Sequence, residues 1–273
     1  MKIDHLLVVS LGTIVGLTAC SSDQKEEVRK PNILILLADD AGYADFGFMG
    51  SADIQTPNID RLAAEGRIFT DAHVAATVSS PSRSMMLTGR YGQRYGYECN
   101  LDKPGDGIPD DEELLPALLK RYGYRTGCIG KWHLGSEPSQ RPNAKGFDTF
   151  YGLLAGHRSY FYDPETSDKD GNLQQYQYNG QKLSFDGYFT DELASKARQF
   201  VAESERPFML YMSFTAPHSP NEATEEDLAR FEGQPRQKYA AMMYALDRGV
   251  GKIVDELKAA GKFDDTIIFF LSD

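Results

Sequence analysis

Cysteine is scarce in this sequence, with three among 273 residues. Cys99 and Cys128, the two in the body of the chain, are too few for a disulfide framework, which excludes the small domains that depend on one. Whether these two pair is left open by the sequence. Basic residues are also few, 29 against 40 acids, and the formal net charge is −11. We therefore expect no nucleic acid and no anionic membrane surface as a general partner.

Apolar runs of membrane-spanning length are missing, although the first twenty residues stand apart. A lysine near the start precedes an apolar stretch at 6–17, which is too short for a spanning helix and typical of an export signal. The segment 17–20, Leu-Thr-Ala-Cys, resembles the lipobox of bacterial lipoproteins. We expect a lipoprotein signal peptide at 1–19, a lipid anchor at Cys20 and a polar tether at 20–30. We therefore expect an exported lipoprotein, periplasmic or in the outer membrane. The alternatives for the first twenty residues are a plain signal peptide and a buried apolar segment.

The rest of the chain alternates strand and helix patterns. The alternation predicts an α/β fold with a mostly parallel central sheet flanked by helices. Continuous apolar runs predict buried strands at 32–37, 125–130, 207–214 and 266–271. Helices are predicted at 57–65 after a Thr56 cap, at 111–123 with acids in the first turn, at 191–204 after a Thr190 cap, and at 236–260.

Polar side chains follow each predicted strand, where parallel sheets gather their chemistry. They are Asp39 and Asp40, Lys131 and His133, His218, and Asp273. Alone, each has an ordinary explanation: an Asp pair forms turns or caps, a lysine is surface charge, and a histidine is a satisfied core residue. Together, three carboxylates would repel one another without a hard cation, and oxygen-only ligands indicate Ca²⁺ or Mg²⁺ rather than zinc.

The stretch 78–90, VSSPSRSMMLTGR, predicts a short helix with Ser80 as its cap, Pro81 in its first turn and Gly89 at its end. Its amino end, with Arg83 one turn in, outlines a site for an anion. A serine there remains a poor nucleophile, because activation requires a nearby base or a metal.

Several segments of this chain together resemble the type I sulfatases. In that family a Cys or Ser, any residue, Pro, usually Ser and Arg begin the active-site helix, as in Ser79 to Arg83. Matching motifs follow in the family's order over residues 31–273. They are PNILILLADDAGYADFG, GKWHLG, APHSP and LSD.

The resemblance implies that Ser79 is oxidised to formylglycine, whose hydrated form attacks sulfur beside a Ca²⁺ ion. It implies metal ligands at Asp39, Asp40, Ser79 and Asp273. By the same resemblance, Arg83 would stabilise the hydrated aldehyde and Lys131 would offset charge on the sulfuryl oxygens. His133 would assist the turnover of the aldehyde, and His218 would lie near the leaving oxygen as proton donor or sulfate ligand. Serine at position 79 resembles the enzymes matured by a radical iron–sulfur enzyme, which would be an obligate partner.

The segment 146–163 is expected to be rich in loops, with His157 and Arg158 as substrate residues for a sulfated glycan or glycosaminoglycan fragment. The alternative is a surface loop packed by its own tyrosines.

The family's smaller carboxy-terminal subdomain is missing after Asp273, so a truncated catalytic domain at 31–273 is expected. Two rival functions stay open: a phosphomonoesterase or phosphonate hydrolase of the same superfamily, and an inactive sulfate-binding lipoprotein.

Overall fold

The computed structural model describes residues 29–100, 106–167 and 175–273. The predicted signal peptide at 1–19, Cys20 and most of the tether lie outside the described residues. Residues 31–273 form a compact unit by themselves. Among the residues that the structure describes, no helix combines the length and the apolar character needed to cross a membrane.

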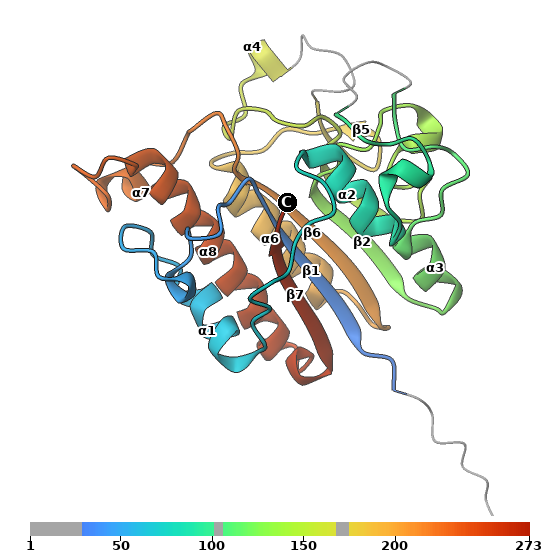
Figure 1. Cartoon of the computed structure of the whole chain (residues 1–273), viewed down its shortest axis with the longest axis horizontal. Helices are drawn as coiled ribbons and strands as arrows, with labels where there is room; N and C mark the ends of the chain where they lie inside the picture. The colour runs from blue at the N-terminus through green and yellow to red at the C-terminus, as the bar shows by residue number, and fades with distance from the viewer. Residues whose placement is uncertain (1–28, 101–105, 168–174) are drawn as a thin grey trace, which may run out of the picture. The chain divides into compact units, whose positions relative to one another are not determined.

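One seven-stranded sheet organises this unit, in the order β5-β4-β3-β2-β6-β1-β7 (Figure 1). The five strands from β3 to β7 in this order run parallel, whereas β4 and β5 are antiparallel additions. The sheet confirms the predicted mostly parallel α/β fold. The strands are β1 (Asn32–Asp39), β2 (Arg125–Lys131), β3 (Thr149–Leu153), β4 (Tyr176–Tyr178), β5 (Gln181–Lys182), β6 (Phe208–Pro217) and β7 (Thr266–Ser272).

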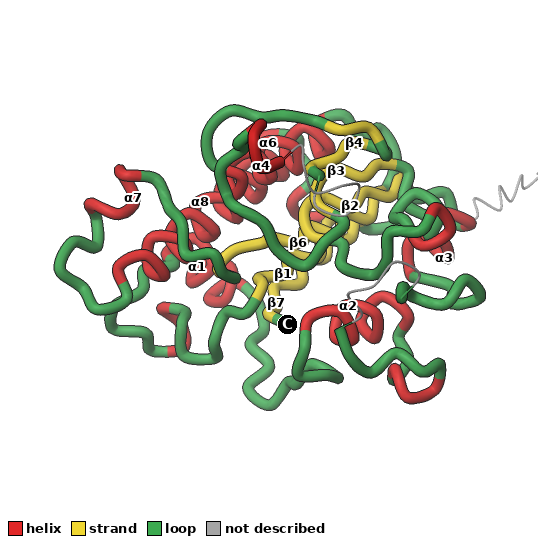
Figure 2. Tube along the Cα trace, turned by 90° about the horizontal axis from the view of Figure 1, so that it is seen from above, coloured by secondary structure: helices red, strands yellow, loops and turns green. Residues whose placement is uncertain are grey.

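Helices cover both faces of the sheet (Figure 2). On one face lie α1 (Pro57–Glu65), α6 (Phe189–Ala202) and α8 (Gln237–Ala259); on the other lie α2 (Ser79–Thr88) and α3 (Leu115–Arg121). The short helices are α4 (Pro164–Ser167) and α7 (Glu225–Ala229), with 3₁₀ turns η1 (Gly47–Met49), η2 (Gly92–Arg94), η3 (Pro138–Gln140) and η4 (Phe263–Asp265).

Alternate residues of β1 serve the two cores on either side of the sheet. Leu34 and Leu36 pack in the core beneath α6 and α8, while Ile35 and Leu37 pack in the core beneath α2. This is the pattern of a strand buried on both faces, and it explains the unbroken apolar run.

One predicted helix start is confirmed and three need correction. Thr56 is the cap position of α1, as predicted, but its hydroxyl donates to Asp60 and makes no capping bond. Ser80 lies inside α2, which begins at Ser79, and Thr190 lies inside α6, which begins at Phe189. The helix predicted at 111–123 begins only at Leu115, after the acids, because a proline at its second position marks a first turn.

The segment expected to be rich in loops contains a strand of the sheet, since 149–153 form β3 between β2 and β4. Its continuation at 154–163 is irregular, and Tyr160 within it is 1% exposed. Cys99 is exposed and Cys128 buried, and both are free thiols.

Candidate active site

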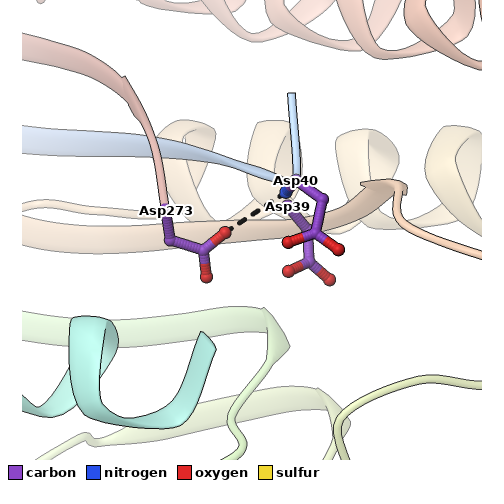
Figure 3. Close-up of side chains that lie close together, drawn as sticks. All are labelled: Asp39, Asp40 and Asp273. Carbon is purple, nitrogen blue, oxygen red and sulfur yellow. Dashed lines mark hydrogen bonds between the residues drawn. The ribbon is translucent and has the colours of Figure 1, made fainter. Parts of the chain in front are cut away.

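Three carboxylates meet at the carboxyl end of the sheet (Figure 3). Asp39 ends β1, Asp40 follows it, and Asp273 follows β7; each offers an oxygen atom within 4.8 Å of the others. The backbone N–H of Asp40 donates to Oδ1 of Asp273 over 3.3 Å. Asp40 has a φ of 64°, a left-handed conformation that aspartate tolerates better than most residues. The turn directs the Asp40 carboxylate toward its two partners.

Arg83 joins two of these carboxylates to the helix opposite. Its Nη2 lies 2.8 Å from Oδ1 of Asp39 and 2.7 Å from Oδ2 of Asp273, and its side chain is fully buried. Burial alone would lower the pKa of Arg83, but Asp273, Tyr211 and Asp39 raise it. The guanidinium is therefore a fixed positive charge within the site.

Ser79, the first residue of α2, lies among these groups. Its hydroxyl lies 3.4 Å from Oδ1 of Asp39 and 3.1 Å from Oδ2 of Asp273, and it accepts a bond of 3.0 Å from Nε of Arg83. Figures 1 and 2 both show the C-terminus at Asp273 beside α2. The helix start and the two strand ends thus share one small polar site.

Lys131 ends β2 and supplies a second buried cation. Its ammonium lies 2.8 Å from each oxygen of Asp39, and its side chain is fully buried. Burial and the charge of Arg83 lower the pKa of Lys131 to about 8, although Asp39 acts to raise it. The ammonium form is the majority at neutral pH, so Lys131 adds positive charge for an anionic substrate.

The carboxylates of this site differ in proton affinity. Burial raises the pKa of Asp39, despite the opposing charges of Arg83 and Lys131. Burial would also raise that of Asp273, but the same two cations hold the pKa of Asp273 below its ordinary value. Three carboxylates against two cations leave a formal charge of −1 when all are ionised. A divalent cation would compensate that charge.

His133 follows β2 in a left-handed conformation, with a φ of 58°. Burial, with the charges of Lys131 and Arg83, lowers the pKa of His133 to about 3, so its ring is neutral at physiological pH. Among the described residues, its buried Nδ1 has no hydrogen-bond partner. Such an atom, in a strained residue beside the site, is available to a bound group.

His218 follows β6 and faces Asp40, with Nε2 at 3.6 Å from Oδ2 of Asp40. Its Nδ1 lies 2.6 Å from the carbonyl oxygen of Ser219. Because a carbonyl only accepts, Nδ1 must carry the proton, so the Nε2 atom is the ring nitrogen on the side of the carboxylates.

The two predicted substrate residues lie differently. His157 is exposed and stacks on His218, with ring centroids 5.6 Å apart and planes at 19°. The guanidinium of Arg158 lies 5.7 Å from the ring centroid of Tyr176. The structure thus brings His157 to the site and places Arg158 against a neighbouring aromatic ring.

Supporting residues at this site escaped the sequence analysis. The hydroxyl of Ser272 accepts from the N–H of Ala41 and donates to its carbonyl, at 3.0 and 2.8 Å, which ties the ends of β7 and β1. Ser213 in β6 accepts a short bond from Arg83. The sequence offers only their positions as a clue: Ser272 directly precedes Asp273, and Ser213 lies inside a predicted strand.

The amino end of α2 is fixed through Ser80. Its hydroxyl donates to the carbonyl of His133 over 2.6 Å and lies 2.7 Å from the hydroxyl of Tyr97, which must then be the donor of that second bond. Burial raises the pKa of Tyr97 to about 12, so this proton is kept. Ser79 and His133 are thereby held in register.

A mostly parallel sheet whose strand ends gather carboxylates around a serine at a helix start is the architecture of the alkaline phosphatase-like superfamily. The chain belongs to the sulfatase family, whose model matches residues 31–273. The resemblance inferred from the short motifs is confirmed.

Known proteins similar to this chain include a solved structure and two curated relatives. The structure of Ps i-CgsB in complex with k-i-k-neocarrahexaose is 41% identical, with a TM-score of 0.83, over 89% of this chain and 58% of that one. Human (Homo sapiens) N-acetylgalactosamine-6-sulfatase is 34% identical over 89% of this chain and 49% of its own length. The uncharacterized sulfatase YdeN of Escherichia coli (strain K12) is 32% identical over 89% and 52%. The chain therefore spans about half the length of these curated relatives.

Proposed function

We propose that the protein hydrolyses sulfate esters at this site, with a sulfated glycan or glycosaminoglycan fragment as substrate. One observation carries the proposal: Ser79 opens α2 within hydrogen-bond distance of Asp273 and Arg83, at the three-carboxylate cluster. Membership of the sulfatase family gives this arrangement its reaction.

The donor set suits a hard divalent cation, and we assign Ca²⁺. All donors are oxygens, the carboxylates converge within 4.8 Å, and the formal charge of −1 remains to be compensated. Asp39, Asp40, Asp273 and the residue at 79 would hold the ion. Ca²⁺ would supply positive charge for the sulfate group.

Ser79 is proposed to be oxidised to formylglycine by a radical iron–sulfur maturase. Formylglycine supplies a nucleophilic oxygen that an unactivated serine hydroxyl lacks. At 8% exposure in the folded chain, Ser79 is poorly accessible, so this partner would act before folding is complete.

The chain's own residues then have distinct roles. Arg83 orients the oxygen at position 79 through Nε, and Lys131 offers its ammonium to the sulfuryl oxygens. His218 would face the leaving alcohol through Nε2, while neutral His133 accepts a proton at its unpartnered Nδ1 during turnover.

A glycan substrate is supported by the neighbours and by the site. Ps i-CgsB was solved in complex with k-i-k-neocarrahexaose, and the human relative is an N-acetylgalactosamine-6-sulfatase. His157, which stacks on His218, and its neighbour Arg158 would contact the sugar. An exported lipoprotein anchored at Cys20 would meet such polymers outside the cytoplasm.

The test is co-expression with the maturase, followed by mass spectrometry of the peptide containing Ser79 and assays of sulfate and phosphate release. Loss of two hydrogens at Ser79, with sulfate release that Ser79→Ala abolishes, supports the proposal. An unmodified serine with phosphate or phosphonate turnover would favour the rival hydrolases. Sulfate binding without turnover would favour the inactive lipoprotein.

A further inference from the structure

The irregular segment after β3 contacts both histidines of the site. An ideal Cβ added to Gly156 would lie 2.6 Å from Cε1 and 2.8 Å from Nε2 of His133, so the backbone there lies directly against that imidazole. The next residue, His157, stacks on His218. One short segment therefore packs against side chains that leave two different strands.

Tyr160 joins this segment to the turn that carries His218. Its hydroxyl lies 2.5 Å from the carbonyl oxygen of Thr215 and 2.8 Å from that of His218. A single proton is shared between the two acceptors, and the same turn is closed by the N–H of His218 donating to Thr215 over 3.1 Å. With 1% of its surface exposed, Tyr160 faces no competition from water for these bonds.

Glu222 fixes the backbone of Tyr160 from the other side. Its Oε2 accepts from the hydroxyl of Ser159 over 2.8 Å and from the N–H of Tyr160 over 2.7 Å. The N–H of Phe189, at the start of α6, donates to the carbonyl of Tyr160 over 2.8 Å. Tyr160 is thus anchored through its backbone and its hydroxyl at once.

We propose that Tyr160 is a positioning residue, which fixes His157 and His218 relative to each other so that a sulfated sugar meets the two imidazoles as one preformed surface. Glu222 assists by holding the backbone from which Tyr160 projects. The effect of Tyr160 on sugar binding rests on the proposed function, whereas its effect on the positions of His157 and His218 does not.

The experiment compares Tyr160→Phe with Tyr151→Phe as the matched control. Tyr151 is also a buried tyrosine, at 6% exposure, and its hydroxyl donates over 2.5 Å to Glu192 on α6. Both substitutions remove one buried phenolic hydroxyl and keep the ring. With five histidines in the chain, of which one lies in the predicted signal peptide, the imidazole NMR signals can be assigned by single substitutions.

We expect the signals of His157 and His218 to shift in Tyr160→Phe and to stay unchanged in Tyr151→Phe, because the stacked geometry relaxes only in the former. In the matured enzyme, KM for k-i-k-neocarrahexaose should rise about tenfold, the worth of one buried hydrogen bond, with a smaller change for 4-nitrophenyl sulfate.

Unchanged His157 and His218 signals in Tyr160→Phe would overturn the proposal, whatever the activity. Shifted signals in a protein without sulfatase activity would support the positioning and reject the proposed function. If Tyr160→Phe fails to fold, Glu222→Gln gives the second test, because it keeps the size of the side chain and an acceptor oxygen but removes the charge. The His157 and His218 signals should then move in the same direction by a smaller amount. Unchanged signals in this variant would again overturn the proposal.

Discussion

At the scale of single residues, Arg83 has the most demanding position in the molecule. It is fully buried, it bonds two carboxylates, and it donates to Ser79 and Ser213. Only a planar, forked cation can satisfy so many acceptors from one position.

We therefore expect Arg83→Lys to lower sulfate ester hydrolysis by at least about 100-fold, because a lysine cannot span Asp39, Asp273 and Ser79 together. Steady-state kinetics of the matured enzyme measures this. Arg90→Lys is the matched control: Arg90 follows the same helix, is 45% exposed and pairs with Glu112. Equal losses in the two variants would contradict the assigned role.

Gly156 gives a second prediction at this scale. In Gly156→Ala the new methyl group would lie 2.6 Å from Cε1 of His133, so the imidazole must move. We expect kcat to fall about tenfold or more, with a smaller change in the urea midpoint of unfolding, since the ring can shift within the site. Unaltered kcat would mean that the position of His133 is unimportant for turnover.

At the scale of elements, α6 and α8 are joined by a network of charges. Asp191 on α6 bonds Arg248 and Lys252 on α8, at 2.8 Å to each. Burial would raise the pKa of Asp191, but the bonds from Arg248 and Lys252 hold it below the ordinary value of 3.8. Its contribution to stability is therefore present above pH 3.8 and lost as the pH falls through the lower, folded-state pKa.

Asp191→Asn should lower the free energy of unfolding by about 1–2 kcal/mol at pH 6, a modest value because the Asp191 side chain is 30% exposed. The difference from the parent protein should shrink as the pH falls below about 4. Urea titrations at a series of pH values measure it. A difference that grows toward low pH would have the wrong sign for this explanation.

Elements were more predictable from sequence than their beginnings. The run at 32–37 was recognisable because a strand buried on both faces admits few polar residues. The run at 266–271 also forms a strand, but the prediction that it is buried was wrong: β7 lies at the edge of the sheet, and Ile267 and Phe269 are exposed. The start of α1 after Thr56 was predictable as well. The start of α2 was not, because the hydroxyl of Ser80 donates to the carbonyl of His133 rather than capping the helix. β4 and β5, of three and two residues, are too short to leave a periodic pattern.

At the scale of the whole molecule, the site unites distant parts of the chain. Motif order and the rule for strand ends are sufficient to predict from the sequence that Asp39, Ser79 and Asp273 lie together. Ser272 and Tyr160 could not be found that way, because their roles depend on backbone acceptors contributed by other segments.

Metal binding should therefore stabilise the whole fold. We expect added Ca²⁺ to raise the melting temperature and EGTA to reverse the rise, since the proposed ion would bind only where β1 and β7 have come together. Asp40→Asn should reduce the Ca²⁺-dependent rise by removing one ligand. Differential scanning calorimetry on the unmodified protein suffices, and an identical rise in the variant would exclude Asp40 from the site.

Because β1 pairs with β7, the sheet can be completed only after both strands have been synthesised. Asn32 lies in register with Thr266, so the first strand of the described residues is hydrogen-bonded to one made more than two hundred residues later. Until then this edge of β1 has no partner, although its other edge can already pair with β6, and a sheet closed by such distant contacts forms slowly. Holding chaperones should therefore raise the yield of native protein more than they would for a helical chain of equal length.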